Sequence, residues 1–194
     1  MRLVLATRNQ HKLREFARLL DGVVLEPLPA DVTLPPEDGD TFAANALGKA
    51  RAAAAALGRA AIADDSGVEA EALGGAPGIR SARFAGPGAD DAANLARLRE
   101  QAPAGSGLRY MCVIAYAEPG GEGRTFEGTC TGRLARDARG HGGFGYDPAF
   151  LPDDVADGRT MAELSDAEKD AISHRGRAAR ALLSWLRPGS PGAS

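Results

Sequence analysis

An apolar run that meets two adjacent carboxylates constrains the fold of this chain more than any other feature. The segment IADDSG (62–67) begins with small apolar residues that are typical of a buried strand, and Asp64 and Asp65 follow at its expected end. Side chains alternate along a strand, so the two carboxylates should point to opposite faces. We interpret the strand as a rigid mount for a carboxylate that a divalent cation such as Mg²⁺ stabilises. A turn that caps the strand is the alternative.

Apolar runs and helical patterns alternate along the chain and predict a mixed α/β domain with one central sheet. Strands are expected at 2–6, 23–28, 60–63, 107–118 and 124–136, and helices at 11–20, 41–57, 90–101 and 173–186. The turn PGGEG between the last two strands predicts that they pair as a hairpin. We expect a single domain over residues 1–187 and a disordered tail over 188–194.

Composition limits the classes of function. The chain has 194 residues, 44% of them hydrophobic, and a net charge of −3, which is typical of a globular protein and disfavours binding to nucleic acid. No apolar run approaches the ~18–20 residues that span a bilayer, so no membrane partner is expected. Cys112 and Cys130 form no CxxC motif, and reduced cysteines suit a cytoplasmic protein.

Lysine is rare in this chain, which has 20 arginines and only Lys12, Lys49 and Lys169 as lysines. A lysine that persists in such a composition can mark a position where the compact ammonium group is needed. Each of the three falls within a motif described below.

The segment ATRNQHK (6–12) lies where the first strand should meet the first helix. Ligands bind beyond the carboxyl ends of strands in open α/β sheets, and a helix N-terminus offers amide groups to an anion. Thr7 and Asn9 add side-chain donors, and Lys12 on the first turn could reach a phosphate. A capped helix with a solvated lysine explains the segment equally well.

Two further features could complete a phosphate and metal site. Lys49 lies about 20° from Phe42 on the helical wheel of 41–57, so it either extends to the surface or points into a cleft. Glu37 and Asp38, in a proline-rich loop, could supply a second carboxylate to a cation. An acidic surface loop is the alternative.

Two segments of the second half could bind a base. GHGGFGYDPAF (140–150) contains a literal GxGxxG, but Pro148 disfavours the helix that a dinucleotide site requires. Its glycines and aromatic residues instead suggest a wall on which a flat ring stacks. In ELSDAEKDAISHRG (163–176), Lys169, His174 and Arg175 form a donor cluster that could read the 6-keto oxygen of a purine. For the first segment the alternative is a glycine-rich loop with structural aromatic residues, and for the second it is ordinary surface charge.

Five segments together resemble the inosine triphosphate pyrophosphatase family, the RdgB-like enzymes. They are LATRNQHKLREF, PEDGDTFAANALGKA, AIADDSGVEAEALGGAPGIRSARFAG, GGFGYDPAF and AELSDAEKDAISHRGRAA, which occur in the family's order. The resemblance implies hydrolysis of deaminated purine nucleoside triphosphates (ITP, dITP, XTP) to the monophosphate and pyrophosphate. It also implies Mg²⁺ dependence, a homodimer, and a mixed sheet flanked by helices in two lobes with an active-site cleft between them.

The resemblance also assigns roles to individual residues. It implies Asp65 as proton acceptor and metal ligand, and Glu37 as the second metal ligand. The residues implied to bind substrate are Thr7, Asn9, Lys12, Lys49, Ser66, Phe144, Gly145, Tyr146, Asp147, Lys169, His174 and Arg175. Three other functions stay open: a pyrophosphatase for modified pyrimidines, a general phosphatase, and a nucleotide-binding module without catalysis.

Overall fold

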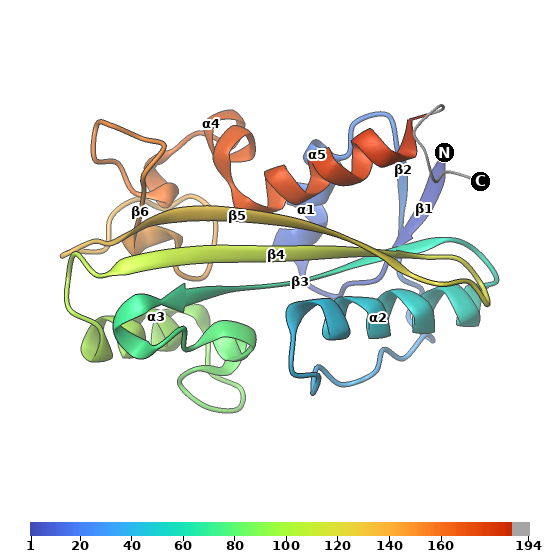
Figure 1. The fold of residues 1–194 in the computed structure, drawn as a ribbon, viewed down its shortest axis with the longest axis horizontal. Helices are drawn as coiled ribbons and strands as arrows, with labels where there is room; N and C mark the ends of the chain where they lie inside the picture. Colours follow the sequence, from blue (N-terminus) through green and yellow to red (C-terminus); the bar gives the residue numbers. More distant parts are fainter. Residues whose placement is uncertain (188–194) are drawn as a thin grey trace. The chain divides into compact units, whose positions relative to one another are not determined.

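The computed structural model describes residues 1–187, and its elements follow the expected order closely (Figure 1). The strands are β1 (Arg2–Leu5), β2 (Val24–Pro27), β3 (Ala61–Ala70), β4 (Gly107–Ala117), β5 (Arg124–Leu134) and β6 (Phe150–Pro152). The α-helices are α1 (Gln10–Leu19), α2 (Phe42–Leu57), α3 (Asp91–Gln101), α4 (Asp166–Ile172) and α5 (His174–Leu186). The tail expected at 188–194 lies outside the described residues.

The strands of residues 1–187 form one mixed sheet in the order β2-β1-β3-β4-β5-β6. β1 pairs in parallel with both β2 and β3, whereas β5 and β6 run antiparallel. Helices connect the parallel strands, as the crossover between parallel neighbours requires. The expected α/β class, with a mixed sheet flanked by helices, is therefore confirmed. Within the described residues, no helix combines the length and the apolar character needed to cross a bilayer.

Capping residues set the ends of the two N-terminal helices. The Asn9 side chain caps α1, and the Thr41 hydroxyl accepts the Ala44 N–H at the start of α2. α2 ends at Gly58, which adopts the left-handed conformation (φ 62°) that favours glycine. Ser165 and Glu168 form a capping box at the start of α4.

The prediction that a strand ends at the acidic pair is wrong. β3 continues for ten residues, from Ala61 to Ala70, and the pair lies in its middle. Charge normally ends a buried strand, but here the carboxylates meet buried cations from other elements. The short strand β6 was also not expected, because its three residues include a proline and give no periodic signal.

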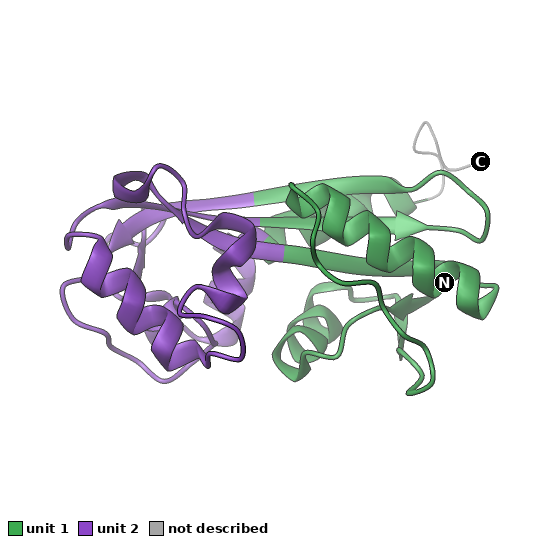
Figure 2. Ribbon diagram, turned by 90° about the horizontal axis from the view of Figure 1, so that it is seen from below, with its two compact units in different colours: residues 1–65, 112–128, 175–194 green, residues 66–111, 129–174 purple. Residues whose placement is uncertain are grey.

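The chain divides into two compact units (Figure 2). Of the described residues, unit 1 contains 1–65, 112–128 and 175–187, and unit 2 contains 66–111 and 129–174. In unit 1 the helices α1 and α5 share an apolar core with the sheet, in which Phe16, Ile62 and Leu182 are buried. α2 buries a row of alanines, including Ala46, Ala50 and Ala53.

Unit 2 has its own core, which packs α3 and the segment around β6 against the sheet. Leu98, Tyr110, Phe150 and Met161 are buried in it. Alternate residues of the strands, such as Glu69 and Arg109, point away from this core. Unit 2 thus has an apolar sheet face and a polar one, as the period of two along a strand requires.

Candidate active site

Asp64 is the centre of a buried ionic cluster in unit 1. Its side chain is 1% exposed, and Oδ2 lies 2.9 Å from Lys12 Nζ and 3.6 Å from an Arg175 Nη2 nitrogen. Burial opposes ionisation, but the charges of Lys12, Arg175 and Lys49 outweigh it and lower the pKa of Asp64 to about 2. Asp64 is therefore a permanent anion that holds these cations in place.

Asp65 has the opposite electrostatic environment. Burial raises the pKa of its carboxyl above the ordinary value, and the charge of Glu37 adds to the rise. A hydrogen bond of 2.8 Å from the Asn45 side-chain amide to Oδ2, together with the charge of Lys49, acts against it. A carboxylate with a raised pKa is the better proton acceptor of the two.

The Lys49 side chain is buried, so of the two positions considered from the sequence, extension to the surface is excluded. Its ammonium group donates to Glu37 Oε1 and, at 2.6 Å, to the backbone carbonyl of Asp64. Burial opposes its charge, but Asp64 and Glu37 raise the pKa of Lys49 above the ordinary value. Glu37 thus lies beside the acidic pair.

The segment after β1 forms a capped helix start. Asn9 Oδ1 accepts the N–H groups of His11 (2.9 Å) and Lys12 (3.3 Å), and Thr7 Oγ1 accepts the Asn9 N–H. Of the two alternatives for this segment, the capped helix start therefore describes the amides of His11 and Lys12. The Asn9 side chain uses its oxygen for the cap, which directs its NH₂ donors elsewhere.

Sequence reasoning missed Arg8, which fixes the loop that carries Glu37. Its guanidinium donates to four carbonyls between residues 28 and 32, at 2.7 to 3.3 Å. Asn45 was not among the predicted site residues, yet it bridges the Gly39 N–H (2.9 Å) and Asp65. Asn45 thus ties the proline-rich loop to the acidic pair, and Arg8 ties the start of that loop to the segment after β1. Only long-range contacts reveal this.

A second buried ion pair lies in unit 2. Lys169 Nζ donates to Asp147 Oδ2 at 2.6 Å, and the two side chains are 5% and 4% exposed. The same oxygen accepts the Phe144 N–H at 2.9 Å, and the Lys169 ammonium lies 5.4 Å from the Phe144 ring centroid. The structure thus brings together three residues that the sequence placed in two separate segments.

The glycine-rich loop of unit 2 is held at several points. Asp91, at the start of α3, accepts the Gly145 N–H at 2.9 Å, and the Tyr146 hydroxyl donates to the Ser81 carbonyl at 2.7 Å. Gly143 has φ +68°, and a Cβ there would lie 2.0 Å from the nearest Asp147 carboxylate oxygen. These contacts hold the loop in one conformation, so that it forms a rigid wall.

The other predicted residues fall in both units. Ser66 follows the acidic pair in β3 and is half-buried. His174 is buried in unit 2, and its ring stacks on Tyr110 at 4.5 Å. Arg175 belongs to unit 1, where its guanidinium contacts Glu15 and Asp64 instead of projecting as a surface charge. Burial opposes its charge, but Glu15 and Asp64 raise the pKa of Arg175 above the ordinary value.

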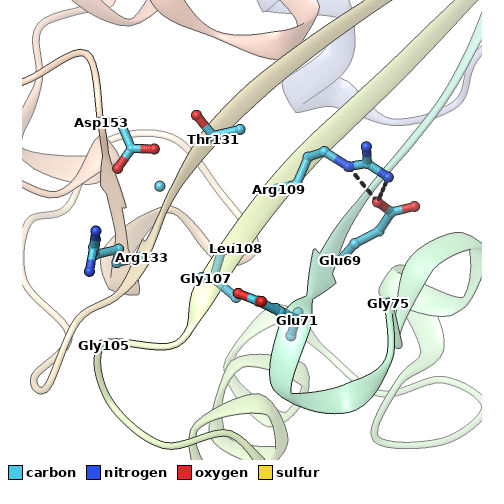
Figure 3. Close-up of a pocket in the computed structure, with 12 residues that line it drawn as sticks. Glu69, Glu71, Gly75, Gly105, Gly107, Leu108, Arg109, Thr131, Arg133 and Asp153 are labelled. Carbon is cyan, nitrogen blue, oxygen red and sulfur yellow. Dashed lines mark hydrogen bonds and ion pairs between the residues drawn. The ribbon is translucent and has the colours of Figure 1, made fainter.

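A separate pocket lies on the polar sheet face of unit 2 and contains none of the predicted site residues (Figure 3). Its volume is about 520 Å³. Arg109 and Glu69 form a salt bridge at one side, and Arg133 and Asp153 lie at another. The pocket is therefore lined by charges of both signs, and none of its lining residues belongs to the Asp64 cluster or to the Asp147–Lys169 pair.

The fold and the buried cluster of unit 1 together indicate the class of protein. A buried carboxylate pair with opposed pKa shifts lies in the middle of β3, just beyond its parallel pairing with β1, and beside two buried or half-buried lysines. Such an arrangement is typical of α/β enzymes that act on phosphorylated substrates. The family model described as the Ham1 family matches residues 3–185. The chain belongs to the Ham1 family.

Relatives are similar to this chain over almost their whole length. A dITP/XTP pyrophosphatase of Symbiobacterium thermophilum is 52% identical over 190 residues, which cover 95% of this chain and 94% of that protein. A dITP/XTP pyrophosphatase of Mycobacterium tuberculosis is 49% identical over 197 residues, which cover 96% and 95%.

Solved structures agree with the fold. A HAM1 protein from Coxiella burnetii superimposes with a TM-score of 0.84 and 40% identity, covering 96% of this chain and 98% of that one. The Ham1 protein of Staphylococcus aureus gives a TM-score of 0.81 with 38% identity, again over 96% and 98%.

Proposed function

We propose that this chain hydrolyses deaminated purine nucleoside triphosphates (ITP, dITP and XTP) to the monophosphate and pyrophosphate. Such a reaction removes these nucleotides from the pool before they enter DNA or RNA. The observation that carries the proposal is the division of roles between Asp64 and Asp65, since adjacent carboxylates with opposed pKa shifts suit acid–base chemistry. The Ham1 membership and the names of the relatives support the substrate class.

Asp65 is proposed to accept the proton of the attacking water. Its raised pKa brings it nearer to neutral pH, which favours proton transfer. Asp64 is unsuited to this step, because its Oδ2 atom is held by Lys12 and Arg175 and its pKa is about 2. Asn45 orients the Asp65 carboxylate through their hydrogen bond.

The phosphate groups are proposed to bind Thr7, Asn9, Lys12 and Lys49. Both lysines are held by carboxylates of unit 1 and so carry fixed positive charge close to Asp65. Preorganised cations of this kind stabilise the charge that develops on a leaving pyrophosphate.

The carboxylates of unit 1 fit a Mg²⁺ ion held by Glu37 and Asp65. The charge of Glu37 raises the pKa of Asp65, so the two groups are close enough to interact, and a cation would offset their repulsion. Within residues 1–187 no three His, Cys, Asp or Glu gather into a complete cage. Mg²⁺ commonly uses one or two carboxylates and takes its other ligands from phosphate and water. When bound, the ion would neutralise and orient the triphosphate.

The base is proposed to bind the residues predicted from the two later segments. Lys169 and His174 supply donors for the 6-keto oxygen, with Arg175 assigned to the same role by the family resemblance. Ser66, Phe144, Gly145, Tyr146 and Asp147 complete the proposed substrate site. A donor-lined site rejects a 6-amino group, because two donors would then face each other.

The proposal also includes the assembly, the location and the domain bounds. We propose that the chain forms a homodimer in the cytoplasm and that residues 1–187 make up one pyrophosphatase domain.

Product analysis tests the reaction and the base preference together. The protein is incubated with Mg²⁺ and, in parallel, dITP, XTP, GTP or ATP, and pyrophosphate and orthophosphate are measured separately. We expect pyrophosphate from dITP and XTP and little product from GTP or ATP. Orthophosphate as the main product would exclude a pyrophosphatase, and a lack of turnover with every purine would favour a binding module.

A further inference from the structure

Tyr110 lies between the two segments that the sequence assigned to base binding. It belongs to β4 and is 5% exposed. Its ring stacks on His174, with centroids 4.5 Å apart and planes 13° apart, and on Phe150 at 4.3 Å and 24°. All three residues lie in unit 2.

The Tyr110 hydroxyl contacts the other of these two segments, through Asp147. It donates to Asp147 Oδ1 at 3.0 Å, while Asp147 Oδ2 accepts from Lys169 and from the Phe144 N–H. The Asp147 side chain is 4% exposed, so water cannot readily replace a lost donor. Tyr110 therefore controls the rotation of the carboxylate that directs the Lys169 ammonium.

We propose that Tyr110 is a positioning residue for base recognition, which fixes the His174 ring by stacking and the Asp147–Lys169 pair by hydrogen bonding. The inference rests on the proposed function, because it assigns a task to residues of the proposed base site. Tyr110 itself reads no base. It sets the directions in which the two donor side chains point, and small changes in such directions reduce discrimination between bases.

The substitution Tyr110→Phe separates the two contacts, since it removes the hydroxyl and keeps the stacked ring. We expect KM for dITP to rise about five- to tenfold, the scale of one ordinary hydrogen bond. We expect kcat to stay within about twofold, because the proposed proton acceptor and phosphate donors belong to unit 1. The ratio of kcat/KM for dITP to that for dATP should fall by the same factor as kcat/KM for dITP, because displaced donors no longer favour a 6-keto oxygen over a 6-amino group.

Tyr116→Phe is the matched control. Tyr116 lies in the same strand, and its hydroxyl donates to Glu118 at 2.6 Å, away from the proposed base site. Its removal should change neither KM nor the selectivity ratio. Thermal melting of both variants checks that any effect of Tyr110→Phe is not a general loss of folded protein.

The stacking contact has an independent readout. The chain has three histidines, so the ring-proton resonances of His174 can be assigned by NMR. We expect an upfield ring-current shift that persists in Tyr110→Phe and disappears in Tyr110→Leu.

The outcomes separate this inference from the proposed function. If the wild-type protein does not release pyrophosphate from dITP, the proposed function is wrong and the inference falls with it. If the wild type is active but Tyr110→Phe keeps its KM and selectivity, only the inference is wrong. An equal loss of kcat on dITP and dATP with a lowered melting temperature would indicate a purely structural role and would also overturn it.

Discussion

Asp64 and Asp65 are neighbours in β3, yet their pKa values shift in opposite directions. Asp64 faces Lys12 and Arg175, whereas Asp65 faces Asn45 and the charge of Glu37. The alternation of side chains along the strand produces this division. It predicts that equivalent substitutions at the two positions have different consequences.

Asp65→Asn should abolish most of the activity and leave the fold intact. The amide cannot accept the proton of the attacking water, a contribution that is typically ~10²–10⁴ in rate. We expect kcat on dITP to fall by at least that factor, with a melting temperature near that of the wild type. Near-normal turnover in a steady-state assay would contradict the assignment of Asp65 as proton acceptor.

Asp64→Asn should act mainly on stability. It leaves Lys12 without its carboxylate partner and Arg175 with Glu15 alone, and loss of one partner from a buried ion pair typically costs about 3–5 kcal/mol. Urea unfolding should show a lower midpoint than that of Asp65→Asn. If both variants unfold at the wild-type midpoint, the ionic cluster does not contribute to stability as described.

Gly143→Ala should disrupt the Asp147–Lys169 pair. The added methyl group would lie 2.0 Å from Asp147 Oδ2 and 2.8 Å from Lys169 Nζ. We expect a rise in KM for dITP of tenfold or more, on the scale of ~1.4 kcal/mol or above. Gly158→Ala is the control, because Gly158 also has a positive φ (+72°) but no atom within 4 Å of the added methyl group. Equal KM values in the two variants would argue against a role for this contact.

Arg8→Ala should weaken the response to Mg²⁺. Arg8 holds the carbonyls of the loop after β2, and Glu37 lies further along the same loop. Without these bonds the loop gains freedom, and the Mg²⁺ concentration for half-maximal activity should rise several-fold. Titration of EDTA-treated protein with Mg²⁺ measures this. Arg59→Ala, which loses only an exposed pair with Glu26, should titrate like the wild type.

Glu168→Gln should lower the melting temperature in a way that depends on pH. Hydrogen bonds from Arg159 and from the Ser165 backbone lower the pKa of Glu168 from 4.5 to about 2 in the folded state. A lowered folded-state pKa stabilises the fold above about pH 4.5, and the stabilisation is lost as the pH falls towards about 2. The melting difference from the wild type should therefore shrink across that window. Glu100→Gln, at an exposed position of α3, should show no such trend.

Local patterns predicted most elements of the fold. Apolar runs and capping residues placed β1, α1, β2 and α2 to within a few residues, because each is formed by contacts close in sequence. They failed at β3, where two charges indicated an end to the strand. The cations that permit those charges, Lys12 and Arg175, lie far away in sequence, so no local pattern reveals them.

The candidate site was predictable in its residue types more than in its contacts. The resemblance pointed to Lys169 and Asp147, and the structure places them in one ion pair. It gave no reason to select Arg8, Asn45 or Tyr110, whose contacts join residues that are distant in sequence. A strand tyrosine or a loop arginine has too many ordinary roles for its type alone to indicate a site.

The alternation along β3 has a consequence for how this chain can change during evolution. Two chemically identical side chains differ here only by whether their position in the strand is odd or even. Inserting or deleting one residue between Ala61 and Asp64 would exchange the faces of the two carboxylates without altering the composition of the strand. Length variation among descendants of this sequence should therefore collect in the loops, while the ten-residue count of β3 stays constant.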